Sequence, residues 1–255
     1  MKKTLSTVGL LLILSLFSFS ILAQNDLQTF LVFEDNVLPG KEKEYVQVAK
    51  QQVELFKKYD FKFPFYVHST SDNLYYWVVP VENLAMADDV FKEFETWGAK
   101  LKENNETDIH KAYKGKYDHM MVKTIVWSSE LSYKPTVPRL KEGERAFVRW
   151  WFCYLYPGED SEFYNKQVKY VDFFKKANAI TGFDTYWGMM GTEMPLIIYI
   201  ERYKDEMDML TTRDELFNSL DPKVSELWED MKQHIRKVEI KTGWFRPNLS
   251  YMPEN

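Results

Sequence analysis

Charged side chains on predicted strands are the residues of this sequence best suited to chemistry. Strand alternation in the runs 121–127 and 238–245 places Lys123, Glu239 and Lys241 on one face, which should be enclosed, whereas the opposite face should lie against helices. Arg149 lies in the middle of another strand-like run. Enclosed charges need partners, because an unpaired buried charge is very costly. We predict that these four residues form a cluster that binds an anionic or carbonyl-bearing ligand. The alternative is a structural ion-pair network.

Aromatic side chains are abundant on the same predicted strands and allow two interpretations. Rings on the wall of a pocket stack on planar apolar ligands, and buried tyrosine hydroxyls need hydrogen-bond partners. The same rings could instead fill a core between packed layers. As ligand-binding candidates we name Trp77, Trp151, Tyr186 and Tyr199.

The histidines and the single cysteine form no recognisable motif. His68, at the end of a strand, is a candidate general acid–base, and Glu239 is the other weak catalytic candidate. No two histidines have metal-ligand spacing, and no nucleotide-binding glycine motif occurs. Cys153 is mid-strand, where a buried inert thiol is expected. The sequence therefore predicts no metal site and no cofactor, and haem is not expected.

Composition limits the class of protein. The 255 residues are 45% hydrophobic and 28% charged, which suits a chain that folds around a core. A formal net charge of −5 argues against a nucleic-acid-binding protein. One cysteine excludes a disulfide framework within the chain.

The chain contains one pattern written twice, with an offset of 118 positions. The offset aligns Pro39-Gly40 with Pro157-Gly158 and Lys123-Thr124 with Lys241-Thr242, and clusters of matches occur in order at both ends of the unit. The predicted organisation is a first α+β repeat at 28–135, a linker at 136–145 that carries Pro138 and Gly143, and a second repeat at 146–253.

Each repeat is expected to contain the elements β-α-β-β-α-β, the ferredoxin-like order. In the first repeat the strands are expected at 29–33, 63–67, 74–79 and 120–127. In the second they are expected at 146–156, 183–187, 196–200 and 238–245. One such unit leaves a sheet face uncovered, so two units can bury their faces against each other within one chain.

This duplicated pattern resembles the dimeric α+β barrel superfamily fused in tandem, and within it the NIPSNAP-like and antibiotic-biosynthesis-monooxygenase-like groups. The residues that carry the resemblance are the repeat itself and the step Pro-Gly-x-x-x-Glu-[Tyr/Phe] at 39–45 and 157–163. The resemblance implies a pseudo-dimeric α+β barrel that holds a small organic molecule. It implies no single reaction, because one fold hosts many functions.

The N-terminus predicts export. Lys2 and Lys3 precede an apolar run from Val8 to Leu22 and a small residue, Ala23, which is the pattern of a secretory signal peptide at 1–23. An uncleaved anchor is the alternative. After cleavage no transmembrane span is expected, and the predicted location is the periplasm or the exterior.

Two main functional hypotheses follow. The first is an exported protein that binds a small apolar or aromatic molecule, with its activity open. The second is a cofactor-independent monooxygenase, isomerase or lyase acting on such a molecule. A non-catalytic scaffold is a third alternative. An enclosed void lined by the rings and charges would favour a ligand.

Overall fold

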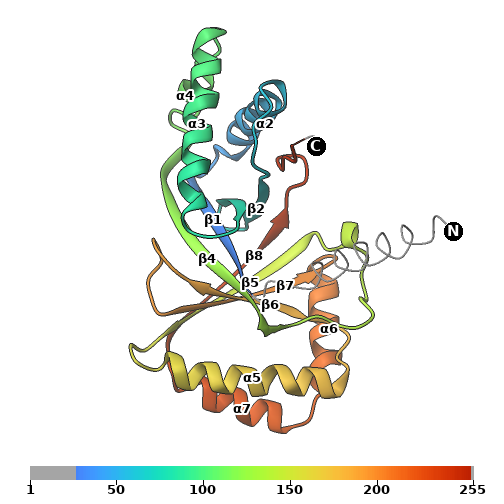
Figure 1. Ribbon diagram of the computed structural model, residues 1–255. Coiled ribbons are helices and arrows are strands. Elements are labelled where there is room, and N and C mark those ends of the chain that lie inside the picture. The colour runs from blue at the N-terminus through green and yellow to red at the C-terminus, as the bar shows by residue number, and fades with distance from the viewer. Residues whose placement is uncertain (1–26, 254–255) are drawn as a thin grey trace, which may run out of the picture.

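The computed structural model describes residues 27–253 as an α+β protein built on a closed antiparallel barrel of eight strands. Around the barrel the strand order is β1-β3-β2-β8-β5-β7-β6-β4. Helices α2, α3 and α4 lie on one side of the barrel, and α5, α6 and α7 lie on the opposite side (Figure 1). The predicted signal peptide at 1–23 lies outside the described residues.

The two halves of the chain place their elements in the same sequence. The elements of the first half are β1 (Leu27–Val37), α2 (Glu42–Lys58), β2 (Tyr66–Thr70), β3 (Leu74–Val81), α3 (Met86–Glu103), α4 (Asp108–Ala112) and β4 (Tyr117–Tyr133). After a short 3-10 turn (Glu142–Glu144), those of the second half are β5 (Phe147–Leu155), α5 (Asp160–Ala177), β6 (Phe183–Gly188), β7 (Leu196–Tyr203), α6 (Glu206–Ser219), α7 (Lys223–Lys232) and β8 (Ile235–Phe245).

The first strand and helix of each half show why the matched motif recurs. Gly40 and Gly158 both have positive φ, at 77° and 89°, which glycine adopts without steric strain. Helix α2 then begins at Glu42 and α5 at Asp160, each with acidic side chains in the first turn. Acidic groups there are favourable because the N-terminal end of a helix carries a partial positive charge. A turn and a helix start therefore occur at matched positions.

Two seams close the barrel between the halves. At one seam, β2 pairs with β8 from His68↔Phe245 to Thr70↔Gly243. At the other, β4 pairs with β6 from Ile125↔Gly188 to Ser128↔Thr185, and then, after a register shift, at Tyr133↔Phe183. This second seam makes β4 longer than the predicted run 120–127, because its later residues continue along β6.

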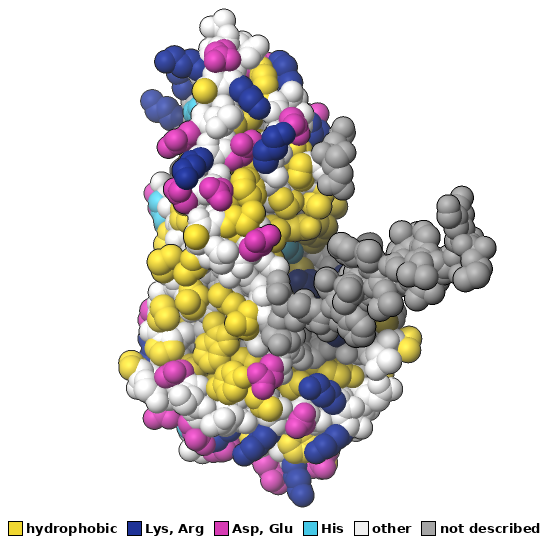
Figure 2. All heavy atoms as spheres, viewed as in Figure 1, with side chains coloured by type: hydrophobic (Ala, Val, Ile, Leu, Met, Phe, Trp, Pro, Cys, Tyr) yellow, Lys and Arg dark blue, Asp and Glu magenta, His cyan; other side chains and the backbone are white. Residues whose placement is uncertain are grey.

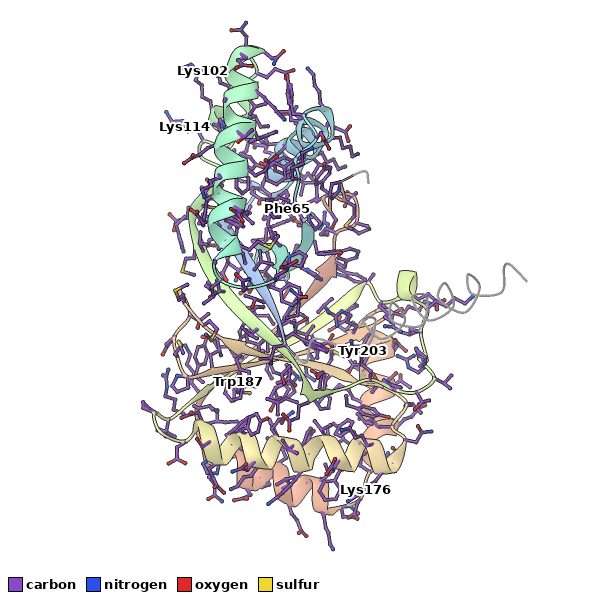
Figure 3. All side chains as sticks on the ribbon, in the orientation of Figure 1. Phe65, Lys102, Lys114, Lys176, Trp187 and Tyr203 are labelled. Atoms are coloured by element: carbon purple, nitrogen blue, oxygen red, sulfur yellow. The ribbon has the colours of Figure 1, made fainter. Side chains whose placement is uncertain are left out.

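Strand alternation divides most of the buried apolar residues into three cores, and a small fourth cluster joins Phe147, Tyr203 and Met209. Inward-facing residues such as Val32, Trp150 and Ile198 form a core inside the barrel. Outward-facing residues pack beneath helices, in one core on the first half and in another on the second. Phe65, which belongs to the first of these helix-covered cores, lies toward the helices in Figure 3.

The prediction that the outer faces of β4 and β8 lie against helices is wrong for several residues. Val122, Val238, Ile240 and Trp244 are 37%, 42%, 47% and 43% exposed. Hydrophobic side chains also gather on the flank between the two helical layers, whereas charged side chains cover the outer ends of the helices (Figure 2). The helices thus leave part of the barrel wall open. Among residues 27–253, no helix has the length and hydrophobicity needed to cross a membrane.

Candidate functional site

The interior of the barrel contains a cavity of about 980 Å³. Every strand contributes to its wall, because side chains at alternate positions of each strand point inward. The middle of the cavity is apolar and aromatic, and its two ends carry charged groups. The residues of the middle include Phe30, Val32, Tyr76, Val78, Ile125, Trp150, Phe152, Tyr186, Ile198 and Ile200.

Rings from both halves of the chain meet across this middle section. Tyr76 of β3 contacts Trp150 of β5 edge to face, with ring centroids 5.9 Å apart. Phe30 of β1 contacts Tyr186 of β6 at 5.8 Å in the same geometry. Burial raises the pKa of the Tyr186 hydroxyl to about 12, so this group is a neutral hydrogen-bonding group. Tyr186, one of the rings named from the sequence, therefore lines the cavity.

His68 lines the cavity beside these rings. Its imidazole contacts Trp150 at 5.9 Å and Phe245 at 5.2 Å between ring centroids. Burial, together with the nearby Arg202 guanidinium, lowers the pKa of His68 to about 3. No hydrogen bond between described residues contributes to this shift. At neutral pH the ring is an uncharged group that can donate one hydrogen bond and accept another.

One end of the cavity contains three residues of the predicted polar cluster. Lys123 pairs with Glu34 at 2.6 Å, Lys237 pairs with Glu239 at 2.6 Å, and Lys241 pairs with Asp72. The Tyr154 hydroxyl donates to Glu239 Oε2 at 3.2 Å. Lys123, Glu239 and Lys241 are thus brought together at one barrel mouth, and each has a partner of opposite charge.

The opposite end of the cavity contains a second charged group that the sequence analysis missed. Arg202 pairs with Asp184, and the Trp127 indole donates to Asp184 Oδ1 at 3.1 Å. Lys134 and Arg145 also line this end. The repeat could have revealed Asp184. The 118-residue offset aligns Tyr66 with Asp184 and His68 with Tyr186, so Asp184 lies two residues before a ligand-binding candidate and on the same strand face.

Arg149 does not belong to the cavity, so the prediction that it joins Lys123, Glu239 and Lys241 is wrong. Trp150 is the residue that pairs with Lys241 between β5 and β8, which turns Arg149 to the outer face. There its guanidinium lies 4.2 Å from the ring centroid of Trp151 and 3.6 Å from Glu201 Oε2. A register one residue away would have placed it inside, because successive strand residues face opposite sides.

The rings of Trp151 and Tyr199 also lie outside the cavity. They face each other across β5 and β7 and pack beneath the second helical layer, where Trp151 contacts Trp228 at 6.2 Å. The Tyr199 hydroxyl donates to Gln167 Oε1 at 2.7 Å. The alternative interpretation as core packing describes both residues.

Trp77 occupies the matching core of the first half and joins a buried hydrogen-bonded chain. Its indole donates to the Tyr45 hydroxyl at 2.8 Å, and this hydroxyl donates to Asp35 Oδ2 at 2.5 Å. Asp35 Oδ1 has no hydrogen-bond partner in the part of the chain that the structure describes. Burial raises the pKa of Asp35 to about 6, although the hydrogen bond from Tyr45 opposes this.

The remaining histidines and the cysteine lie away from the cavity. His234 Nδ1 is 2.6 Å from Glu159, and its Nε2 is 2.8 Å from Lys166 Nζ. His119 is paired with Asp118 on the surface. Burial raises the pKa of the Cys153 thiol to about 12, which disfavours the reactive thiolate. Among residues 27–253, no group of three or more His, Cys, Asp or Glu side chains is arranged to hold a metal ion.

Solved structures share this architecture at very low sequence identity. An anthrone oxidase-like protein has a TM-score of 0.56 and 9% identity, over 88% of this chain and 92% of its own. A protein from Fusobacterium nucleatum named "Putative monooxygenase" has a TM-score of 0.53 and 12% identity, over 87% of this chain and 93% of its own. No family model and no curated protein matches the chain. The similarity confirms the predicted resemblance to α+β barrel proteins at the level of the fold.

The prediction of no cofactor, with haem not expected, is corrected by a further structure. A haem-binding protein from Thermus thermophilus has a TM-score of 0.43 and 9% identity, over 87% of this chain and 92% of its own. Among the histidines of residues 27–253, His68 lines the cavity. The similarity does not assign haem to this chain.

Proposed function

We propose that this protein binds a small, largely apolar or aromatic organic molecule inside its barrel. The observation that carries the proposal is the cavity of about 980 Å³, which is lined by rings and aliphatic side chains and contains one uncharged imidazole. Ligand pockets are typically ~300–1,000 Å³ with a few placed polar groups, so the volume and the lining suit a ligand.

The lining favours a ligand over a scaffold role. A well-packed protein interior has few voids larger than a water molecule. This barrel instead leaves space among Val32, Trp150 and Ile198, although its sheet–helix cores are filled by rings such as Trp77 and Trp151. Apolar contact with an occupant would return the dispersion and burial energy that an empty cavity loses.

In this proposal His68 is a hydrogen-bonding group for the ligand. At neutral pH its uncharged ring would bind a hydroxyl, a carbonyl or an amide of the occupant, since it can act as both donor and acceptor. The surrounding Trp150 and Phe245 rings exclude water from one side of this interaction. A hydrogen bond in such surroundings gives specificity, because a ligand that lacks the group leaves the imidazole unsatisfied.

The direct test is titration with a neutral fluorescent probe, N-phenyl-naphthylamine. Wild-type protein should bind the probe with a rise in emission. The variant Ile198→Trp should bind it at least about tenfold more weakly, since the larger ring occupies the cavity. Arg149→Met, outside the cavity, is the matched control and should bind as wild type does. Equal binding by all three proteins, or no binding by folded wild type, would refute the proposal.

A second candidate function is turnover of the bound molecule, with His68 as the acting group. The observation that favours it is the position inside the cavity of an imidazole whose pKa shift includes no hydrogen bond from the described residues. The lowered pKa makes His68 a weak general base at neutral pH, so binding is the better supported function. Titration with haemin tests the same residue: an absorption band that forms with wild type and is lost in His68→Ala would identify a haem-type occupant.

The duplicated origin and the export of the chain are also proposals. The strand orders β4-β1-β3-β2 and β8-β5-β7-β6, read from the closed barrel, support two matched repeats at 28–135 and 146–253. Lys2, Lys3 and the apolar run that follows support a signal peptide with cleavage after Ala23. Mass measurement of the mature chain from its native cell, together with fractionation, tests the second proposal.

A further inference from the structure

The end of the barrel that contains Asp184 opens toward a second hollow. This hollow of about 260 Å³ lies beneath the linker between the halves and is lined by residues of the linker and of β6 and β7. Lys134, Arg145, Asp184, Ile200 and Arg202 line both the hollow and the barrel cavity. The two spaces therefore adjoin at this end of the barrel.

The charges at this end are unbalanced. Arg202 is paired with Asp184, and Arg139 is paired with Asp208 at 2.7 Å. Lys134 and Arg145 have no carboxylate partner among the described side chains. At the opposite end, by contrast, each lysine that lines the cavity is paired with an acid.

Both unpaired cations are held in place without a carboxylate. The Lys134 ammonium lies 4.6 Å from the ring centroid of Trp127. Arg145 donates from Nε and Nη2 to the Leu140 carbonyl at 3.2 and 3.0 Å, within its own linker. Among the side chains that the structure describes, these contacts leave the positive charge of each group without a carboxylate partner, and no other acceptor contacts the remaining guanidinium hydrogens of Arg145. A positioned arginine is suited to a carboxylate or another small oxyanion.

We propose that the ligand is an amphipathic organic acid, whose anionic group is bound by Lys134 and Arg145 beneath the linker and whose apolar body lies in the barrel. This inference rests on the proposed function, since it assigns a chemical class to the same occupant. The apolar middle section holds the body, His68 binds a polar group along it, and the linker cations fix its direction. The balanced charges at the opposite mouth offer no comparable attraction for an anion.

A matched pair of probes separates the anionic group from the apolar body. Anilinonaphthalene sulfonate and N-phenyl-naphthylamine share their fused-ring and phenyl groups and differ in the sulfonate. The variant Lys134→Gln/Arg145→Gln should weaken binding of the sulfonate probe about tenfold or more, because two charge-assisted contacts are lost. Binding of the neutral probe should stay within about twofold of wild type, since its contacts are apolar. Added salt should weaken only the sulfonate probe.

Two control variants decide where the anion binds. Lys241→Gln removes a cation that lines the other end of the same cavity, and Lys141→Gln removes an exposed linker lysine that lines neither space. Both should bind the sulfonate probe as wild type does. Unchanged sulfonate binding in the double variant, or an equal loss in Lys241→Gln, overturns the inference while neutral-probe binding still supports the barrel site. Failure of folded wild type to bind either probe overturns both the inference and the proposed function.

Discussion

Two buried titratable groups give this protein opposing dependences of stability on pH. In the folded state His68 has its pKa lowered to about 3 from 6.5, and Asp35 has its pKa raised to about 6 from 3.8. Between about pH 3 and pH 6.5 the unfolded chain holds a proton on His68 that the folded protein lacks, so stability is lost as pH falls. Between about pH 4 and pH 6 the folded protein holds a proton on Asp35 that the unfolded chain lacks, so stability is lost as pH rises.

The two contributions have similar magnitudes in the window where they overlap. Integrated from about pH 4 to pH 6, at 1.36 kcal/mol per unit of pKa difference, the His68 contribution increases stability by about 2.5 kcal/mol. Over the same interval the Asp35 contribution decreases it by about 2 kcal/mol. Water inside the cavity would solvate a charged imidazole, so the value for His68 is an upper limit.

The perturbation is a neutral replacement at each position, His68→Gln and Asp35→Asn. The assay is urea unfolding followed by tryptophan fluorescence at several pH values, with the free energy of unfolding of each variant compared with wild type. Relative to wild type, His68→Gln should gain about 2.5 kcal/mol as pH falls from about 6 to 4. Asp35→Asn should gain about 2 kcal/mol as pH rises across the same interval.

The free energy of unfolding of each variant is compared with that of wild type because the other carboxylates titrate in the same pH window. Their contribution is the same in both proteins and cancels in the difference. His119→Gln, at an exposed histidine of β4, controls for the substitution itself. A flat difference curve for His68→Gln would mean that the folded protein accepts a proton on His68 as readily as the unfolded chain does. His68 would then be a readily protonated imidazole and not an uncharged group of the cavity wall. A flat curve for Asp35→Asn would likewise refute the buried, protonated carboxyl.

Three further predictions concern packing. Gly243→Ala places a Cβ 1.9 Å from a β2 carbonyl where β2 pairs with β8, and should lower the free energy of unfolding by urea by about 1–3 kcal/mol. Gly98→Ala, in open space on α3, should raise it by about 0.5–1 kcal/mol, and equal effects of the two substitutions would contradict this prediction. Cys153 should react with a thiol reagent only as the protein unfolds, so rapid labelling of native protein would count against its burial. Arg149→Met should lower the free energy of unfolding by about 1–2 kcal/mol and leave the affinity for the probes unchanged. A changed affinity without a loss of stability would argue against a structural role for Arg149.

The local elements of the fold could be predicted from the sequence because they depend on short-range patterns. Alternating apolar residues and the matched Pro-Gly turns indicated the strands of both halves, apart from β4, to within a few residues. The likeness of one half to the other also indicated two sheets that bury their open faces against each other, and the resemblance to the α+β barrel superfamily implied that they close into a barrel. The length of β4 was underestimated, because its later residues are strand only through pairing with β6.

The composition of the site was predicted less well, since it depends on register. The sequence shows that Arg149 and Trp150 are neighbours, but only the pairing of Trp150 with Lys241 decides which of them faces the cavity. In the same way His68 and Tyr186 were recognised as strand residues, but their meeting on the cavity wall near Arg202 depends on how the strands of the two halves pair. The amino-acid sequence alone determined the order of the local elements and the residue types available for a site. The tertiary structure decided which side chains share an enclosed space, because a shift of one residue between paired strands reverses the face of every side chain.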